Sequence, residues 1–296
     1  WLVRIRWRTI LWYGEINLMN FPTILVVGFG RMGQSLTLWL AVQGVSVVVQ
    51  TRRQPEACMK AFRTSVLRSV KQKKVSGLSA SDVLRRVFFV DAPEYEKVDW
   101  VLECLEENLL VKVDFLSSLP RDFKGIVSTN TSTLSINELI RYAPSANLFM
   151  GTHFFNPVPL MSLVEVVASE STDQVVVRRV CDFLEAHGKV PIRVPDQVGF
   201  LVNRILFSSI FEAMELLDKS QVSVDEVDTC IKLGCSWPMG PLELADYIGL
   251  DVCERIMENL AEDNSYSFSR VPDILRKIVS EGHLGRKTGK GFYEYG

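Results

Sequence analysis

The sequence contains no long apolar run and no clustered cysteines. No stretch approaches the ~18 consecutive apolar residues that a membrane-spanning helix requires. The six cysteines form no C-x-x-C pair, so we expect neither a disulfide framework nor a cysteine-based metal site. They are Cys58, Cys104, Cys181, Cys230, Cys235 and Cys253. These absences predict a soluble intracellular protein with reduced thiols. They leave its compartment, the mitochondrial matrix or the cytoplasm, open.

The sequence also lacks a strong net charge. Its 33 Lys and Arg residues and 35 Asp and Glu residues give a formal charge of −2, which indicates neither a nucleic-acid partner nor an acidic tail. With 296 residues, 47% of them hydrophobic, the chain can bury a sizeable core. At about 150 residues per domain, it should form two domains.

Residues 1–18 are rich in arginine and poor in acids. Arg4, Arg6 and Arg8 precede the first acid, Glu15. An arginine-rich, acid-poor segment is typical of a mitochondrial presequence, although serine, which such segments also favour, is scarce here. The alternative is a misassigned start, with translation beginning at Met19. Both explanations stay open at this point.

The apolar runs after residue 22 predict a parallel α/β domain. A run at residues 24–27 is followed by a glycine-rich turn, a helical stretch to about Gln43 and a second run at residues 45–49, which together predict a βαβ unit. Further buried strands are expected at residues 87–90, 100–102, 125–128, 148–150 and 163–167. Residues 19–195 are therefore predicted to form a Rossmann-like, doubly wound sheet domain.

The segment after residue 195 is predicted to be entirely helical. Helices are expected at residues 200–219, 223–233, 240–259 and 272–281. Ser223, with Glu226 three residues later, is typical of a helix start because the hydroxyl and the carboxylate can cap free N–H groups. The predicted fold class is thus α/β, with the sheet domain followed by an all-helical C-terminal domain at residues 196–296.

The glycine-rich turn between the first strand and helix predicts a dinucleotide site. Its sequence, GFGRMG at residues 28–33, follows the G-x-G-x-x-G pattern. Glycines let the backbone approach a pyrophosphate, whose charge is received by the free N–H groups and the positive dipole end of the helix. We assign Gly28, Gly30, Met32 and Gly33 to cofactor binding.

The end of the second strand carries no acid. An Asp or Glu about 20 residues after the glycine turn would bind the ribose 2′-hydroxyl of NAD, but this chain has Thr51 followed by Arg52 and Arg53. A neutral residue and two guanidinium groups suit a 2′-phosphate better, which locally favours NADP. The alternatives are that both arginines are only solvated, or that an arginine stacks on the adenine while NAD is used.

Histidine titrates nearest neutral pH and is the expected base for a hydroxyl proton in a hydride-transfer reaction. The chain has three histidines, His153, His187 and His283. His187 precedes a glycine at a predicted helix end, where imidazoles bind terminal carbonyls, and His283 lies in a polar segment. His153 follows a predicted strand and is the candidate base.

Several further motifs accompany the glycine turn. They are TNTSTL at 129–134, HFFNPV at 153–158, LVEV at 163–166, GFLVNR at 199–204, MGPLEL at 239–244 and GRKTGKGFY at 285–293. In this order, and from Thr23 to Tyr295, they resemble the L-3-hydroxyacyl-CoA dehydrogenase family. The resemblance implies a short-chain 3-hydroxyacyl-CoA or 3-hydroxybutyryl-CoA dehydrogenase. Such an enzyme transfers hydride between C3 of (S)-3-hydroxyacyl-CoA and NAD in fatty-acid metabolism and β-oxidation.

The resemblance implies four catalytic residues. His153 is the implied general base, and Glu165 is its carboxylate partner, which fixes the imidazole tautomer and stabilises the imidazolium. Glu165 lies in an apolar strand, where a carboxylate needs a partner. Ser132 and Asn203 match the polar residues around the substrate's hydroxyl and thioester oxygens, which they would bind. The alternatives are that Ser132 is one more loop hydroxyl and that Asn203 caps a helix or joins the domains.

Further charged residues match family positions near nucleotide ligands. Glu107 and Lys112 match positions near the nicotinamide ribose, although a charge pair at a helix start needs no function. Residues 57–81 contain six basic residues and no acid: Lys60, Arg63, Arg68, Lys71, Lys73 and Lys74. The resemblance implies that Lys60 and Lys71 bind the phosphates of coenzyme A, and a solvated helix face is the alternative. Nucleic acid is not an expected partner, because no groove-reading motif is present.

The chain departs from the family at two positions. Thr51 replaces the acid after the second strand, which weakens the case for NAD, and Ser162 stands where the family commonly has a lysine. We expect an NAD(P)-dependent 3-hydroxyacyl-CoA dehydrogenase that forms a homodimer through its helical domain. The alternatives are an NADPH-dependent 3-oxoacyl-CoA reductase and a non-catalytic dinucleotide-binding protein, like the lens crystallins related to this fold.

Overall fold

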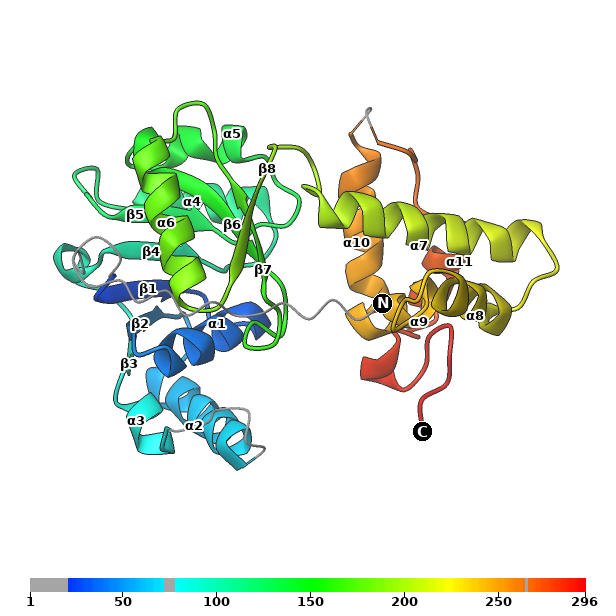
Figure 1. Ribbon diagram of the computed structural model, residues 1–296, viewed down its shortest axis with the longest axis horizontal. Helices are drawn as coiled ribbons and strands as arrows, with labels where there is room; N and C mark the ends of the chain where they lie inside the picture. Colours follow the sequence, from blue (N-terminus) through cyan, green and yellow to red (C-terminus); the bar gives the residue numbers. More distant parts are fainter. Residues whose placement is uncertain (1–20, 72–77, 264–265) are drawn as a thin grey trace, which may run out of the picture.

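The computed structural model describes residues 21–71, 78–263 and 266–296. This part of the chain forms a sheet domain followed by a helical domain (Figure 1). The segment at residues 1–18, with its alternatives of a presequence and a misassigned start, lies outside the described residues, as do Lys73 and Lys74. Within the described ranges, no helix is long and apolar enough to cross a membrane.

An eight-stranded sheet, counted over the described residues, forms the centre of the first domain in the order β3-β2-β1-β4-β5-β6-β7-β8. The strands are β1 (Thr23–Val27), β2 (Ser46–Gln50), β3 (Val87–Val90), β4 (Trp100–Glu103), β5 (Ile126–Thr129), β6 (Phe149–Phe154), β7 (Leu163–Val167) and β8 (Val190–Val194). All neighbours pair in parallel except β6 and β7, which are antiparallel. The predicted doubly wound α/β class is confirmed.

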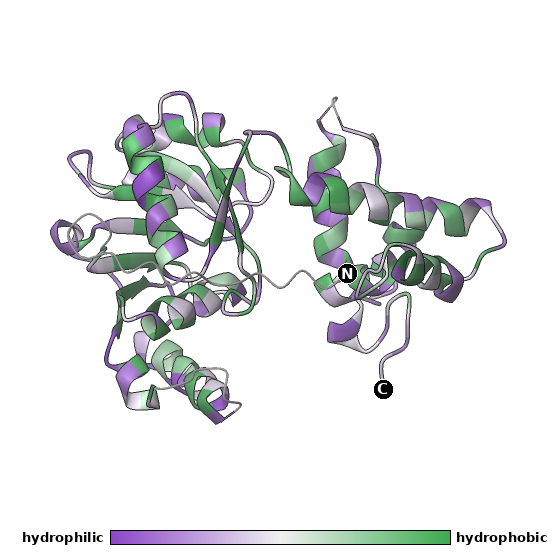
Figure 2. Ribbon diagram, in the orientation of Figure 1, coloured by the Kyte–Doolittle hydropathy of each residue, from purple (hydrophilic) through white to green (hydrophobic). Residues whose placement is uncertain are grey.

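Helices cover both faces of this sheet. They are α1 (Arg31–Val42), α2 (Pro55–Lys71), α3 (Ala80–Leu84), α4 (Leu109–Ser118), α5 (Ile136–Leu139) and α6 (Gln174–Ala186), with short 3₁₀ turns at Tyr95–Lys97, Ile140–Tyr142 and Ala146–Leu148. Side chains alternate along β1: Ile24 and Val26 pack in the core that includes α1, α2 and α6, whereas Leu25 and Val27 pack in the core that includes α4 and α5. Strands buried on both faces are largely hydrophobic, while the helices carry both hydrophobic and hydrophilic residues (Figure 2).

The sequence pattern does not predict β8, which lies at one edge of the sheet. It contains Pro191, and the prolines at 191 and 195 indicate a boundary rather than a strand. An edge strand tolerates proline because it needs ladder hydrogen bonds on one side only. The sheet therefore extends through Val194, immediately before the helical domain.

The helical domain packs around its own apolar core. Its helices, in the described part of the chain, are α7 (Val202–Lys219), α8 (Val224–Gly234), α9 (Pro241–Ile248), α10 (Leu250–Ala261) and α11 (Asp273–Ser280), followed by a 3₁₀ turn at Arg286–Thr288. The core includes Phe207, Met257 and Leu275. The predicted helix start at Ser223 is confirmed, because its Oγ accepts the N–H of Glu226 and its own N–H donates to the Glu226 carboxylate at 2.8 Å.

The prediction of one helix over residues 240–259 is wrong, because Gly249 separates α9 from α10. Its φ of +108° lies outside the right-handed helical range and is one that residues with a side chain rarely adopt. After this break, α10 runs in a new direction and brings Val252, Ile256 and Asn259 to the wall of a cavity shared with the sheet domain.

Candidate active site

The turn at residues 28–33 depends on backbone approaches that glycine permits. Gly28 has a φ of +96°, and a Cβ there would lie 2.8 Å from the carbonyl oxygen of Cys104. A Cβ on Gly33 would lie 2.0 Å from the carbonyl oxygen of Gly28. Gly30 precedes α1 without a side-chain cap, and the space beside it is open. The first N–H groups of α1 are therefore available to an anion, which fits the pyrophosphate of a dinucleotide.

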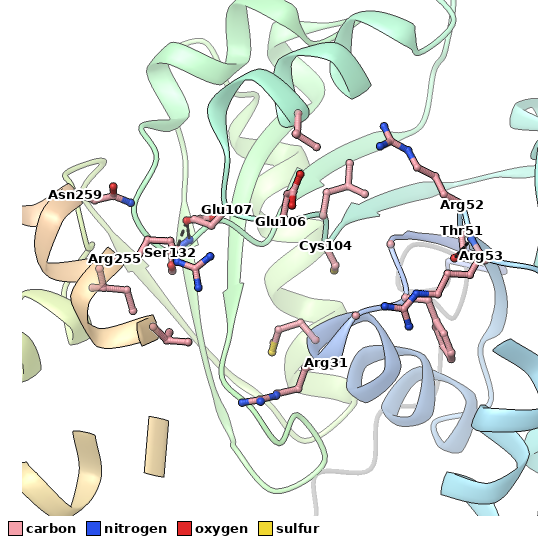
Figure 3. A pocket seen from close by; sticks show the side chains of 18 residues that line it. Arg31, Thr51, Arg52, Arg53, Cys104, Glu106, Glu107, Ser132, Arg255 and Asn259 are labelled. Atoms are coloured by element: carbon pink, nitrogen blue, oxygen red, sulfur yellow. Dashed lines mark hydrogen bonds between the residues drawn. The ribbon is translucent and has the colours of Figure 1, made fainter. Parts of the chain in front are cut away.

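A cavity of about 590 Å³ opens in front of this turn, with walls from both domains (Figure 3). The structure brings most of the residues predicted to bind the cofactor to its wall: Gly28, Gly30, Met32, Thr51, Arg52 and Glu107. Gly33 and Lys112 do not line it, since Gly33 packs behind the turn and Lys112 is buried.

Lys112 is buried against two carboxylates. Its Nζ lies 2.8 and 2.9 Å from the oxygens of Glu103 and 3.5 Å from Oε2 of Glu107. Burial opposes the charged amine, but Glu103 and Glu107 outweigh it and raise the pKa of Lys112 above its ordinary value. The sequence motifs place Lys112 near the cofactor and give no signal for its pairing with Glu103. In the structure Lys112 is a buried cation that does not line the cavity. It contacts Glu107, which does.

Glu107 fixes the loop that carries Ser132. Its Oε1 accepts hydrogen bonds from the hydroxyl of Thr131 at 2.6 Å and from the N–H groups of Ser132 and Thr133 at 2.7 and 2.9 Å. Burial opposes ionisation, but the Lys112 ammonium and these bonds outweigh it and hold the pKa of Glu107 below its ordinary value. The ionised carboxylate therefore keeps Ser132 at the cavity wall.

His153 and Glu165 lie directly opposite each other on the antiparallel strands β6 and β7. Nδ1 of the imidazole is 2.7 Å from Oε2 of the carboxylate, and both side chains are buried. Oε1 accepts the N–H groups of Leu201 at 3.0 Å and of Val202 at 2.9 Å. Burial opposes ionisation of Glu165, but the hydrogen bonds from His153 and Val202 outweigh it and hold its pKa below the ordinary value. With Nδ1 engaged, Nε2 is the ring nitrogen left for a ligand.

A second cavity, of about 780 Å³, has His153 in its wall and continues into the helical domain. Ser132 and Asn203 line it, together with Asn130. Asn203 lies in the first turn of α7, and its Nδ2 donates to the carbonyl oxygen of Ser132 at 3.4 Å, so it also joins the domains. The four residues implied as catalytic thus come together, with Glu165 behind His153. Asn130 was missed, although it lies inside the motif at 129–134.

A second link between the domains lies beside the dinucleotide cavity. Nδ2 of Asn259, on α10, donates to Oγ1 of Thr133 at 2.9 Å. Arg255, one turn earlier on α10, lines the same cavity. Figure 3 shows both side chains entering from the side opposite Thr51. The sequence carries no signal for either residue, because their positions depend on the break at Gly249.

The basic residues of α2 are exposed and do not line these cavities. Lys60 and Lys71 are both exposed. The residues of α2 that face a cavity are Ser65 and Ser69, which line a third one, of about 690 Å³, whose wall also includes Lys189. Contact between the two exposed lysines and coenzyme A stays a prediction.

The other two histidines lie away from the His153 cavity. Nδ1 of His187 is 2.7 Å from the carbonyl oxygen of Phe183 at the end of α6, in the role expected for an imidazole at a helix end. Nδ1 of His283 lies 3.3 Å from the carboxylate of Glu281. His153 is therefore the histidine whose free ring nitrogen can meet a ligand in the cavity between the domains.

Two family models match consecutive parts of the chain. The NAD binding domain of 3-hydroxyacyl-CoA dehydrogenase matches residues 23–197, and the C-terminal domain of 3-hydroxyacyl-CoA dehydrogenase matches residues 199–295.

Similar proteins match almost the whole chain. The mitochondrial hydroxyacyl-coenzyme A dehydrogenase of Sus scrofa is 35% identical over 284 residues, which cover 92% of this chain and 90% of that protein. A probable 3-hydroxybutyryl-CoA dehydrogenase of Deinococcus radiodurans is 37% identical over 274 residues, which cover 91% and 99%. The crystal structure of (S)-3-hydroxybutyryl-CoA dehydrogenase from Ralstonia eutropha has a TM-score of 0.84 at 35% identity and covers 94% of this chain and 100% of that one.

Proposed function

This chain belongs to the 3-hydroxyacyl-CoA dehydrogenase family, and we propose that it interconverts (S)-3-hydroxyacyl-CoA and 3-oxoacyl-CoA with NAD(P) as the hydride carrier. The observation that carries the proposal is the His153–Glu165 pair, which faces Ser132 and Asn203 across one cavity. A protein that only binds a dinucleotide would need neither the paired imidazole nor the amide from the second domain. The (S) configuration is supported by the name of the Ralstonia eutropha enzyme.

His153 acts as the base in the oxidative direction. Because Glu165 holds Nδ1, Nε2 takes the proton of the 3-hydroxyl group, and the carboxylate stabilises the imidazolium that results. A nicotinamide bound in the neighbouring cavity supplies the hydride chemistry at C3 of the substrate. In the reductive direction, the same Nε2 returns the proton to the 3-oxo group.

Ser132 and Asn203 orient the oxygens of the substrate. A hydroxyl and an amide can donate hydrogen bonds to the 3-oxygen and the thioester oxygen without competing with His153 for the proton. Ser132 is held by Glu107 on the sheet domain, and Asn203 comes from α7. The geometry around the substrate therefore depends on the two domains lying against each other, which also keeps water from the reacting atoms.

The coenzyme A part of the substrate can lie beside the loop that follows His153. The cavity of His153 and the cavity at α2 both have Arg31 and Pro157 in their walls, so the two adjoin. In this proposal the acyl group lies at His153, and the nucleotide end of coenzyme A extends toward α2. Its phosphates would then meet the electrostatic field of Lys60 and Lys71.

In this proposal residues 19–195 bind the dinucleotide, and residues 196–296 cover the substrate and form a homodimer. The support for the dimer is an apolar groove between α7 and α8, whose wall includes Leu216, Val222 and Ile231. Leu233, on α8, is 79% exposed. A second copy would bury these side chains. Light scattering on the purified chain should give twice the chain mass, and a monomer would contradict the dimer.

An acyl-CoA substrate implies a place in fatty-acid metabolism, where oxidation of a 3-hydroxyacyl-CoA is a step of β-oxidation. The Sus scrofa relative is named as mitochondrial. Cell fractionation followed by immunodetection would distinguish the two compartments expected from the sequence, the mitochondrial matrix and the cytoplasm.

The direct test is reduction of acetoacetyl-CoA by the purified chain, followed through the absorbance of NADH. We expect His153→Gln to lower kcat by about 10²- to 10⁴-fold, since it removes the group that moves the proton. His283→Gln is the matched control and should retain wild-type turnover, because His283 lies outside the cavity. Lack of turnover by the wild-type chain with both NADH and NADPH would overturn the proposed function.

A further inference from the structure

The end of β2 presents two arginines and no carboxylate to the dinucleotide cavity. β2 pairs in parallel with β1, and the N–H of Gly28 donates to the carbonyl oxygen of Gln50 at 2.9 Å. Thr51 therefore stands beside the glycine turn, where a side chain meets the adenosine ribose of a bound dinucleotide. Thr51, Arg52 and Arg53 all line the cavity.

The side chain of Thr51 is engaged in its own turn. It is 8% exposed, its Oγ1 accepts the N–H of Arg53 at 3.1 Å, and the same atom lies 4.0 Å from Sγ of Cys58. This local bond closes the turn after β2. Asp or Glu at this position would bind both hydroxyls of an unphosphorylated ribose through its negative charge. Thr51 has no such charge and cannot make these charge-assisted hydrogen bonds.

Arg52 and Arg53 are both exposed, and no described residue binds either guanidinium. Arg85, an exposed arginine elsewhere on the same domain, instead pairs with Asp82 at 2.9 Å. Both side chains line the cavity, and Figure 3 shows them leaving the end of β2 in different directions, Arg53 toward the start of α1 and Arg52 away from it. Two unpaired guanidinium groups on one short turn can bind one dianion without first breaking an internal ion pair.

The charge of the whole cavity wall favours an additional phosphate. Its carboxylates are Glu106, which is exposed, and Glu107, which is occupied by the loop at Ser132 and by Lys112. Against these two acids the wall carries four arginines: Arg31, Arg52, Arg53 and Arg255. A cavity lined by an excess of one sign of charge attracts ligands of the opposite sign.

We propose that Arg52 and Arg53 bind the 2′-phosphate of NADP(H), so that this chain binds NADP(H) more tightly than NAD(H) in the same cavity. Guanidinium groups make bidentate, charge-assisted hydrogen bonds to phosphate, and two of them balance the roughly −1.5 to −2 charge of a phosphate monoester. The proposal rests on the dinucleotide cavity of the proposed function and is independent of its acyl-CoA chemistry.

The test is calorimetric titration of the full chain with NADPH and with NADH, in the absence of acyl-CoA. We expect the Kd of NADPH to be at least about tenfold lower than that of NADH. In the double variant Arg52→Ala/Arg53→Ala, the preference for NADPH over NADH should fall by about 10- to 100-fold. Adenosine 2′,5′-bisphosphate and AMP, which carry only the adenosine half, should show the same change. Arg85→Ala removes an exposed arginine elsewhere and should keep the wild-type preference.

Thr51→Asp tests the same site by a gain of function. Its carboxylate can accept the N–H of Arg53 as the threonine hydroxyl does, so the turn should persist. The added charge should strengthen NADH binding and weaken NADPH binding, which reverses the preference. Circular dichroism of each variant shows whether its fold is kept.

Two outcomes would overturn this inference: tighter binding of NADH than of NADPH by the wild-type chain, or an equal loss of both affinities in the double arginine variant. Tight NADPH binding without turnover of acetoacetyl-CoA would sustain the inference and overturn the proposed function. Turnover with NADH and a preference for NADH would do the reverse. The two proposals therefore fail separately.

Discussion

Nδ1 of His153 lies 2.7 Å from Oε2 of Glu165, while the other oxygen of this carboxylate accepts two N–H groups at the start of α7. One side chain therefore orients the candidate base and anchors the helix that carries Asn203. The imidazole on the sheet domain and the amide on the helical domain face the same cavity. Glu165 couples their positions, so a change there affects both sides of the cavity.

We expect Glu165→Gln to lower kcat by about 10²- to 10⁴-fold, because an amide stabilises the imidazolium far less than a carboxylate does. Affinity for the dinucleotide should change much less, since Glu165 does not line that cavity. Steady-state kinetics and a binding titration measure the two effects. Glu170→Gln, on the exposed segment after β7, is the matched control. A variant at position 165 with kcat close to wild type would contradict the assigned role.

Lys112→Met should destabilise the folded chain strongly. It leaves the buried carboxylate of Glu103 without its cation, a change that typically costs about 3–5 kcal/mol. Urea unfolding followed by circular dichroism measures the loss. The double variant Glu103→Gln/Lys112→Met should recover part of it, because the uncompensated charge is removed. Lys97→Met, at an exposed ion pair with Glu94, is the control and should have little effect.

Asn259→Ala should weaken dinucleotide binding rather than the chemical step. It removes the hydrogen bond to Thr133 that joins α10 to the sheet domain beside the cavity. A hydrogen bond of this kind contributes about 0.5–1.5 kcal/mol, which corresponds to about a 2- to 12-fold rise in the KM for the dinucleotide. Asn137→Ala, an exposed residue on α5, serves as the control. A fall in kcat at unchanged KM would show that the link acts on catalysis instead.

Local patterns predict much of this fold because they depend on near neighbours in the sequence. The glycine turn, the strands that flank it and the cap at Ser223 each follow from residues a few positions apart. Local patterns do not predict the break at Gly249, because a glycine inside an amphipathic pattern is compatible with a continuous helix. The break is identified by the positive φ of Gly249 in the folded domain, where α9 and α10 contribute to one core.

The candidate site is only partly predictable for a related reason. The motifs identify His153 and Glu165, but their contact requires the antiparallel pairing of β6 with β7. The pairing of Lys112 with Glu103 joins α4 to the end of β4, and the spacing of these residues in the sequence does not predict this contact. Asn259 reaches Thr133 across the domain boundary, 126 positions along the chain. Contacts between distant segments depend on the packing of whole elements, which periodicity does not specify.

Lys189 supports the loop that follows His153. Its Nζ donates to the carbonyl oxygen of Met161 at 2.7 Å and to that of Val158, and it lies 4.9 Å from the ring centroid of Trp39. The side chain is 6% exposed, and no described carboxylate pairs with it. Burial lowers the pKa of Lys189 to about 8. The amine is thus a buried cation at neutral pH that loses its proton at moderately alkaline pH.

Stability should depend on pH through this residue. In the unfolded chain a lysine keeps a pKa near ~10.4, so between about pH 8 and that value the unfolded state binds more protons than the folded state. The free energy of unfolding that Lys189 contributes therefore rises with pH across this range. We expect the Tm of the wild-type chain, measured relative to Lys189→Met, to increase between about pH 7.5 and pH 10. Lys277→Met, on the exposed face of α11, provides the control for general alkaline effects. A Tm difference between wild type and Lys189→Met that stays flat or falls over this range would show that the buried amine does not titrate there.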